Sequence, residues 1–214
     1  MDDTGVSHTR SPGIPEDAKG SITDFDGAYV GTPPWDIGYA QPALVALVEA
    51  GALRGRVLDV GCGTGEHALL ADSLGFDATG VDSSPRAISL ARAKAEARAL
   101  GPRFVVGDAL DLSFLDGRFD TVFDSGLFHV FNDESRATYV ASLSRAMSSE
   151  ANLLLLCFSD RVPGDFGPRR VGEAELRASF ADGWRIVSLD LVRMIVTFDA
   201  VGVEAWRAVI ARNG

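Results

Sequence analysis

Hydrophobic and polar positions follow two alternating patterns along the chain. Short apolar runs, typical of buried strands, cover residues 56–60, 76–81, 103–106, 119–123 and 152–158. Amphipathic or alanine-rich stretches, typical of helices, cover residues 42–49, 66–74, 84–100, 132–147 and 173–180. Two last apolar segments, 184–198 and 203–211, predict an antiparallel pair at one edge of the sheet. This alternation predicts an α/β fold with a doubly wound, mostly parallel sheet whose central strands are covered on both faces.

The first forty residues break this pattern. Residues 1–20 are polar and contain much Gly, Pro and Asp, which predicts a disordered tail. Residues 21–41 place aromatic side chains among prolines, and we expect an ordered lid or short helix packed on the domain. The whole chain of 214 residues is 46% hydrophobic, so residues 21–214 are expected to form a single domain.

Charge and composition narrow the possible partners. The chain has 20 basic and 30 acidic residues and a net charge of −10, which disfavours nucleic acid and anionic membranes because phosphates are repelled. The longest apolar run, 153–158, is far too short to cross a bilayer. Cys62 and Cys157 lie far apart and match no metal-binding spacing. We therefore expect a cytoplasmic monomer or homodimer with reduced thiols, no metal and a small-molecule partner.

The most specific signal is the sequence VLDVGCGTGE at residues 57–66, in which glycines directly follow a strand and precede a helix. An α/β sheet binds nucleotide-like ligands at such a turn. A dinucleotide fingerprint would need a glycine at Glu66, and a carboxylate there would repel a diphosphate. Asp59 adds a second negative charge just before the loop. S-adenosylmethionine (SAM), a cationic nucleoside without phosphate, fits the loop better, and a nicotinamide dinucleotide is the alternative.

Acidic residues also follow the next two strands. Asp82 is expected to accept hydrogen bonds from both ribose hydroxyls, a feature that dinucleotide enzymes share. Asp108, in the stretch 107–109, would lie near an adenine amino group. Each acid alone is equally typical of a turn or a helix cap. Because the carboxyl ends of successive parallel strands meet at one edge, the acids together predict a nucleoside site.

These residues resemble the class I SAM-dependent methyltransferases, with matching stretches at 57–70, 79–95, 105–112 and 119–131. Residues 29–44, 153–160 and 167–171 are similar to the thiopurine/thiol/halide-like branch, and within it to bacterial heterocyclic toxin methyltransferases, which methylate hydroxyquinolone-type heterocycles. The resemblance covers about residues 21–212. It implies a Rossmann-like sheet of seven strands in the order 3-2-1-4-5-7-6, with the seventh strand antiparallel. One stretch departs from the family: residues 147–152 replace a PGG turn, and we expect a surface turn there.

Carried over by position, the resemblance also implies the cofactor site. It would be formed by Trp35, Asp59, Gly61, Gly63, Asp82, Ser83, Asp108, Ala109 and Ser125. Asp59, Gly61 and Ser125 would contact the methionine end of SAM. Asp82 would bind the ribose, and Asp108 and Ala109 would contact the adenine. Trp35 would pack over the cofactor and close the site, or would instead anchor the N-terminal segment.

SAM already carries a reactive sulfonium. For methyl transfer the protein therefore mainly has to orient the molecule that accepts the methyl group and keep water out of the site. His129, after the fourth strand, is the candidate to orient or deprotonate the acceptor as a neutral imidazole. The alternative is a bond to the start of the next helix or packing with Phe128. Phe25, Tyr29, Phe128 and Phe166 are candidates to line an apolar acceptor pocket, although aromatic side chains are also ordinary core residues.

The sequence therefore predicts an enzyme that transfers a methyl group from SAM to O, N or S of a small, hydroxyquinolone-like aromatic heterocycle, in a detoxifying role. One alternative is a thiol, halide or quinone-precursor methyltransferase. Two others are an NAD(P)-dependent oxidoreductase and a non-catalytic SAM-binding module.

Overall fold

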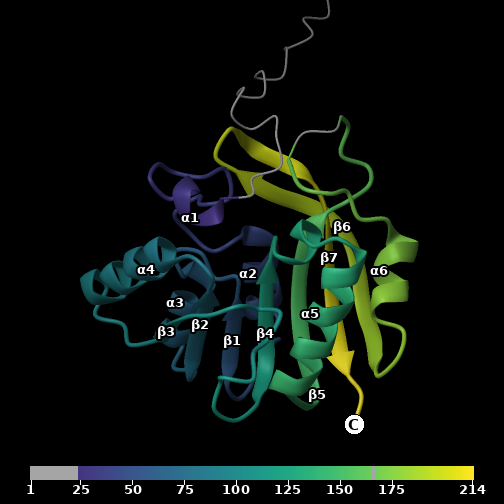
Figure 1. Cartoon of the computed structure of the whole chain (residues 1–214), viewed down its shortest axis with the longest axis horizontal. Helices are drawn as coiled ribbons and strands as arrows, with labels where there is room; N and C mark the ends of the chain where they lie inside the picture. The colour runs from purple at the N-terminus through teal and green to yellow at the C-terminus, as the bar shows by residue number, and fades with distance from the viewer. Residues whose placement is uncertain (1–23, 165–166) are drawn as a thin grey trace, which may run out of the picture.

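A computed structural model describes residues 24–164 and 167–214, so the expected tail and Phe166 lie outside the described residues. Its centre is a seven-stranded sheet in the order β3-β2-β1-β4-β5-β7-β6 (Figure 1). The strands are β1 (Val57–Val60), β2 (Ala78–Asp82), β3 (Arg103–Val106), β4 (Phe119–Ser125), β5 (Met147–Phe158), β6 (Trp184–Val196) and β7 (Asp199–Arg212). Strands β1 to β5 pair in parallel, and β7 is antiparallel to both of its neighbours. The predicted fold class, strand order and antiparallel seventh strand are confirmed.

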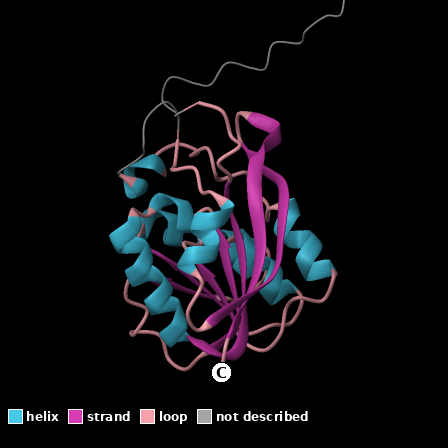
Figure 2. Cartoon of the chain, turned by 90° about the vertical axis from the view of Figure 1, so that its right-hand side faces the viewer, coloured by secondary structure: helices cyan, strands magenta, loops and turns pink. Residues whose placement is uncertain are grey.

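Helices cover both faces of this sheet (Figure 2). The helical elements are α1 (Phe25–Ala28), α2 (Pro42–Glu49), α3 (Glu66–Ser73), α4 (Pro85–Ala97), the 3-10 helix η2 (Phe128–Val130), α5 (Asp133–Ala146) and α6 (Glu173–Ser179). In β5, Leu153 and Leu155 belong to the buried cluster with α5 and α6, and Leu154 and Leu156 to the cluster with α2, α3 and α4. Successive side chains of a strand point to opposite faces, so a strand buried on both sides must be apolar throughout. Over the described ranges, no helix is both long and apolar enough to cross a bilayer.

The stretch at 147–152 is not the surface turn that we expected. It forms the beginning of β5, where Met147 pairs with Phe119 and the register shifts before Thr121. Glu150 has a φ of 60° within this irregularity. Met147 and Ala151 are buried at 0% and 1% exposure, and their burial keeps the segment in the sheet. The extra residues are accommodated as a bulge instead of a turn.

Residues 24–41 hold α1 and a loop that lie against the carboxyl ends of the strands (Figure 1). The Asp26 carboxylate accepts hydrogen bonds from the Ser84 hydroxyl (2.7 Å) and the Arg86 N–H (3.0 Å) at the start of α4. The Gln41 side chain pairs with both backbone groups of Ile195 in β6, donating to the carbonyl (2.8 Å) and accepting from the N–H (3.0 Å). The Thr197 N–H donates to the Pro34 carbonyl at 2.9 Å. The segment is thus fixed to α4 on one side and to β6 on the other.

We predict that Gln41→Leu lowers the free energy of unfolding by ~1–3 kcal/mol, because it leaves the Ile195 N–H and carbonyl without partners. Urea denaturation measures the change. Glu49→Ala, at an exposed position in α2, the helix that follows Gln41, is the control and is expected to stay within ~0.5 kcal/mol of the wild type. Equal stability of Gln41→Leu and the control would show that the amide pairing contributes nothing.

Candidate active site

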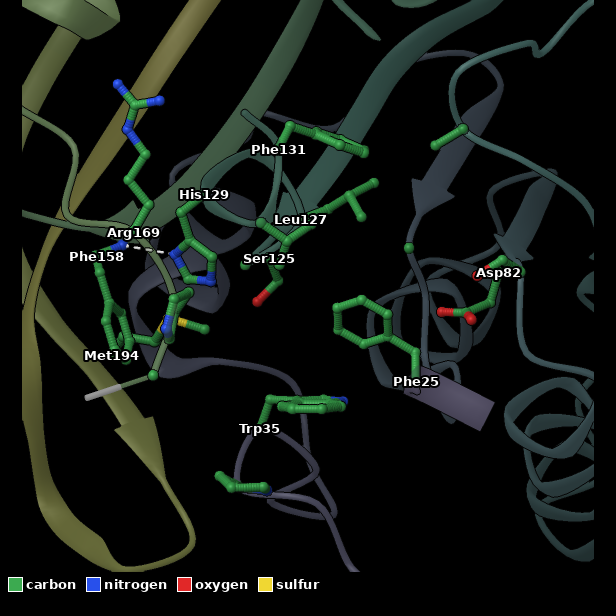
Figure 3. Close-up of a pocket in the computed structure, with 18 of the residues that line it drawn as sticks. Phe25, Trp35, Asp82, Ser125, Leu127, His129, Phe131, Phe158, Arg169 and Met194 are labelled. Carbon is green, nitrogen blue, oxygen red and sulfur yellow. Dashed lines mark hydrogen bonds between the residues drawn. The ribbon is translucent and has the colours of Figure 1, made fainter. Parts of the chain in front are cut away.

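A cavity of about 630 Å³ lies over the carboxyl ends of β1, β2, β4 and β5. Residues 24–41 cover one side of it, and the end of the β6–β7 hairpin forms another wall (Figures 1 and 3). Of the expected site residues, the cavity is lined by Phe25, Tyr29, Trp35, Gly61, Asp82, Ser83, Asp108, Ala109, Ser125 and His129. The structure therefore brings together most of the residues that the sequence singled out.

The glycine loop after β1 needs residues without a side chain. Gly61 and Gly63 have φ angles of 65° and 53°, in the left-handed region that glycine adopts readily. A Cβ atom on Gly61 would lie 3.0 Å from the Leu127 side chain, and one on Gly63 would lie 2.7 Å from the Tyr29 hydroxyl. The loop is a cradle that a side chain would fill, so a ligand can approach the backbone closely.

Asp82, at the end of β2, faces the cavity while holding the loop in place (Figure 3). Its carboxylate accepts hydrogen bonds from the Gly63 N–H and the Ser84 N–H, both at 2.8 Å. Burial raises the pKa of Asp82, and the backbone hydrogen bonds oppose this shift. A carboxylate has about four lone-pair positions, so Asp82 keeps some capacity to accept from ligand hydroxyls. Asp108 lies further along the same edge, where it is exposed and accepts the Leu110 N–H at 2.9 Å.

Asp59 lies beneath the glycine loop and does not line the cavity. One carboxylate oxygen accepts the Ala68 N–H at 3.1 Å, and the other has no partner among the described residues. Burial raises its pKa to about 7. An unpaired, buried carboxylate oxygen is the kind of group that a nearby ammonium would stabilise.

The expectation that the Glu66 carboxylate would repel the diphosphate of a dinucleotide is not supported by its surroundings. Its carboxylate is paired with the Lys94 ammonium at 2.8 Å and with the Arg98 guanidinium at 2.7 Å. These hydrogen bonds lower the pKa of Glu66 against the opposing effect of its burial. The charge is thus compensated from α4, and Glu66 cannot by itself exclude a dinucleotide.

Three aromatic side chains of residues 24–41 meet at the cavity. The Trp35 indole N–H donates to the Tyr29 hydroxyl at 2.8 Å, and the ring centroids of Phe25 and Trp35 lie 5.8 Å apart. Phe25 and Trp35 both face the open centre in Figure 3. The Asp36 carboxylate accepts the Thr64 hydroxyl at 2.8 Å, which ties the segment to the glycine loop. This arrangement places Trp35 in the cavity and anchors it at the same time.

His129 lies on η2 with its two ring nitrogens in different surroundings. Its Nδ1 accepts the Phe158 N–H at 2.9 Å, and the other ring nitrogen faces the cavity (Figure 3). Burial, helped by the charges of Arg170 and Arg136, lowers the pKa of His129 to about 3. A ring that is neutral and already accepts at Nδ1 carries its proton on Nε2. The geometry contradicts the deprotonating role of our hypothesis and is compatible with the orienting role.

The alternative for His129 was a bond to the start of the next helix or packing with Phe128. The ring does have a structural contact, but with another partner: it accepts the Phe158 N–H at the end of β5 and packs against the Phe158 ring. Phe128, the neighbouring residue, was expected in the acceptor pocket but is fully buried in the core. Its ring stacks on Phe180 at 5.5 Å, and the Arg136 guanidinium lies 4.5 Å from the ring centre. Successive side chains of the 3-10 turn point in different directions, so His129 reaches the cavity and Phe128 does not.

Part of the cavity wall was not expected from the sequence. The missed residues are Phe158 at the end of β5 and Met194, Val196 and Phe198 at the end of the β6–β7 hairpin. Their placement follows from strand direction: β6 is antiparallel to β7, which is antiparallel to β5, so β5 and β6 run the same way. The carboxyl-end rule that located Asp82 applies to β6 as well.

We predict that Asp82→Asn raises the dissociation constant of S-adenosylhomocysteine (SAH) roughly 10- to 100-fold, because a hydrogen bond to a charged group contributes ~1.5–3 kcal/mol. Isothermal titration calorimetry measures it, with thermal unfolding as the check on folding. Asp116→Asn is the control, because its side chain is 94% exposed and precedes β4, at the opposite edge of the sheet. An unchanged affinity in Asp82→Asn would contradict a ribose contact.

Comparisons with known proteins agree with this geometry. A family model described as a methyltransferase domain matches residues 57–150. The chain is 39% identical over 170 residues to a 2-heptyl-1-hydroxyquinolin-4(1H)-one methyltransferase of Mycobacteroides abscessus, covering 78% of this chain and 75% of that protein.

Solved structures also show similarity to methyltransferases. A structure described under the conversion of a disulfide bond into a thioacetal group during echinomycin biosynthesis matches with a TM-score of 0.81 and 42% identity, over 88% of this chain and 90% of that one. A Burkholderia thailandensis 1,6-didemethyltoxoflavin-N1-methyltransferase shares the fold with a TM-score of 0.63 at 22% identity, over 81% of this chain and 77% of that one. The glycine cradle, the acid at the end of β2 and these relatives lead to one conclusion: the chain belongs to the class I SAM-dependent methyltransferases and is a small-molecule methyltransferase with SAM as its cofactor.

Proposed function

We propose that the chain transfers the methyl group of SAM to an oxygen, nitrogen or sulfur atom of a small, flat aromatic heterocycle. The observation that carries this proposal is the continuity of the cavity. It begins at the polar edge with Asp82 and continues into a lobe walled by apolar side chains. The similarity to a hydroxyquinolone methyltransferase supports a substrate of the same class.

The apolar lobe suits a planar ring with little charge. Its walls are formed by Leu127, Phe131, Phe158, Met194, Val196 and Phe198. Aromatic and apolar walls bind flat rings by burying their surface. Arg169 also lines the cavity, but its guanidinium is paired with the Asp133 and Glu175 carboxylates, both at 2.5 Å. The lobe therefore favours a neutral or singly ionised heterocycle over a multiply charged one.

In this proposal the polar half of the cavity holds the cofactor, and the residues present fit it. The cofactor would be held by the lining residues Trp35, Gly61, Asp82, Ser83, Asp108, Ala109 and Ser125. Asp59 and Gly63, which were also expected in the cofactor site, do not line this cavity and support the glycine loop through the Asp59–Ala68 and Gly63–Asp82 hydrogen bonds. When bound, SAM supplies an electrophilic methyl group on a sulfonium. Residues 24–41 act as a lid that keeps water out, with Phe25, Tyr29 and Trp35 covering the cavity. A dry site favours the reaction because the positive charge is lost as the methyl group is transferred.

The acceptor in this proposal arrives with its reacting atom ready to attack. Among the described residues that line the cavity, His129 carries its free proton on the inward nitrogen, and the Tyr29 hydroxyl already accepts the indole N–H of Trp35. Burial also raises the pKa of Tyr29, so its hydroxyl stays protonated. Acidic N-hydroxyl, phenol or thiol groups, which ionise in water, are therefore the favoured acceptors. The 42% identity to the structure from echinomycin thioacetal formation specifically supports sulfur as a second acceptor atom.

The proposal includes a detoxifying role, because methylation of an ionisable heteroatom removes its acidity and its capacity to bind metals. Comparing the growth inhibition caused by an acceptor and by its methylated product tests this part. Equal inhibition by the two compounds would contradict it.

We predict that the pH dependence of kcat follows the acceptor and not the enzyme. Since the pKa of His129 is lowered to about 3, its ring stays neutral from pH 5 to 9 and adds no inflection to the pH–rate profile. The rates are measured at saturating SAM, because the ammonium of the bound cofactor is expected to keep Asp59, whose pKa is about 7 in the free protein, ionised. The rate should rise with pH and level off near the pKa of each acceptor. Rates measured for a series of phenols and thiols of different acidity check this. A midpoint fixed between pH 6 and 7 for every acceptor would indicate a titrating residue of the enzyme.

The function itself is tested with SAM carrying a ¹³C-labelled methyl group and a panel of acceptors. The panel holds a 1-hydroxyquinolin-4-one, pyridine-2-thiol, an aliphatic thiol, iodide and a demethylated quinone precursor. We expect labelled product from the first two compounds, identified by NMR at the methylated atom. Transfer only to the aliphatic thiol, iodide or the quinone precursor would favour those alternatives. Tight binding of SAH without any transfer would favour a non-catalytic module.

A further inference from the structure

The bond between His129 and β5 fixes which ring nitrogen carries the proton. The Phe158 backbone N–H is a donor only, and it points at Nδ1 at 2.9 Å. Nδ1 must therefore be unprotonated, and a neutral imidazole then has its single proton on Nε2. Nε2 has no hydrogen-bond partner among the described residues, and the cavity includes this side chain in its wall. The ring thus presents an N–H donor to the cavity.

The direction of this donor is fixed by buried contacts. The turn that carries His129 begins where the Asp124 carboxylate accepts the Leu127 N–H (2.9 Å) and the Phe128 N–H (3.1 Å). The Tyr139 hydroxyl donates to the same carboxylate at 2.8 Å. The His129 ring is 4% exposed and packs edge-on against the Phe158 ring, with 5.0 Å between the centroids. The ring cannot rotate without losing the bond to β5.

Most side chains that surround the cavity near Nε2 are apolar. Leu127, Phe131 and Phe158 lie around this part of the cavity and offer no acceptor side chain, and the Met194 thioether is only a weak acceptor (Figure 3). The Ser125 hydroxyl also faces the cavity, but it makes no hydrogen bond with Nε2 within the described part of the chain. A donor that is removed from water by a bound ring stays unpaired unless the ring itself supplies an acceptor. A site built to hydrogen-bond a ligand discriminates strongly against a ligand that lacks the partner atom.

We propose that His129 determines substrate specificity by donating its Nε2–H to the acceptor heterocycle. The enzyme then selects rings that carry a hydrogen-bond acceptor, such as a carbonyl oxygen or an unprotonated ring nitrogen, on the edge that faces η2. This inference rests on the proposed function and narrows its substrate class. It also explains why a neutral histidine is held so rigidly in a lobe whose walls are mostly apolar.

A pair of ligands and a pair of variants test this. The ligands are 8-hydroxyquinoline and 1-naphthol, which have the same shape and differ by the ring nitrogen. The variants are His129→Gln, whose amide nitrogen can take the place of Nε2, and His129→Asn, whose oxygen can take the place of Nδ1 but whose shorter side chain cannot place its amide nitrogen at the Nε2 position. Asn therefore keeps the bond to β5 without the donor, and Gln keeps the donor without that bond.

Binding of both ligands to the SAH-loaded protein is measured by calorimetry, and kcat and KM are measured with SAM. The wild type and His129→Gln are expected to prefer 8-hydroxyquinoline over 1-naphthol by roughly 10- to 100-fold in affinity and in kcat/KM. In His129→Asn the preference should fall to within about threefold. Thermal unfolding and SAH affinity of each variant show whether the fold is intact.

The possible outcomes distinguish the donor role of His129 from the proposed activity on aromatic heterocycles. A preference retained in His129→Asn but lost in His129→Gln would show a structural role and overturn the inference. Equal binding of the two ligands to the wild type would overturn it too, while methylation of either compound would leave the proposed function standing. If neither ligand binds, both claims fail for this class of ring. A preference in binding without transfer would support the donor and count against the proposed activity.

Discussion

The cavity depends on polar contacts that hold residues 24–41 across the carboxyl edge of the sheet. Asp26 bonds to the start of α4, Asp36 to Thr64 of the glycine loop, and Gln41 to the backbone of Ile195 in β6. These contacts join the segment to three elements that are far apart in the sequence. The strands alone would leave the edge open to water, and the segment alone is too short to fold. Together they form a covered cavity at this edge, which the proposed function requires for the cofactor and the aromatic acceptor.

Charge is distributed unevenly around this cavity, and the distribution matches the proposed reaction. Acids lie at the cofactor half, where Asp82 lines the wall and Asp59 lies buried below the loop. The carboxylate of Glu66, which is nearby, is compensated by Lys94 and Arg98, so it adds little to the field there. The walls of the acceptor half are mostly apolar, His129 is a neutral donor there, and the charge of Arg169 is compensated by Asp133 and Glu175. A cation is therefore favoured at one end and an apolar ring at the other, which suits a reaction that destroys the positive charge.

Much of the fold could be predicted from the sequence because local patterns determine it. The double-sided apolar run of β5 marks a central strand, and the glycines after β1 mark the cradle. The errors concern contacts between distant segments. The sequence does not reveal that Lys94 and Arg98 reach back to Glu66, and on a 3-10 turn it cannot distinguish Phe128, which enters the core, from His129, which faces the cavity. The proton on His129 depends on a backbone N–H of β5, so only the folded structure reveals its tautomer.

The central claim is that one cavity binds both the methyl donor and an aromatic heterocycle. A crystal structure of the complex with SAH and 8-hydroxyquinoline tests it most directly. The account predicts that the ribose hydroxyls contact Asp82 and that the ring lies between Phe131 and Met194, with its nitrogen toward His129 and its oxygen toward the SAH sulfur. A ring bound outside this lobe, or a nucleoside bound away from Asp82, would contradict the account.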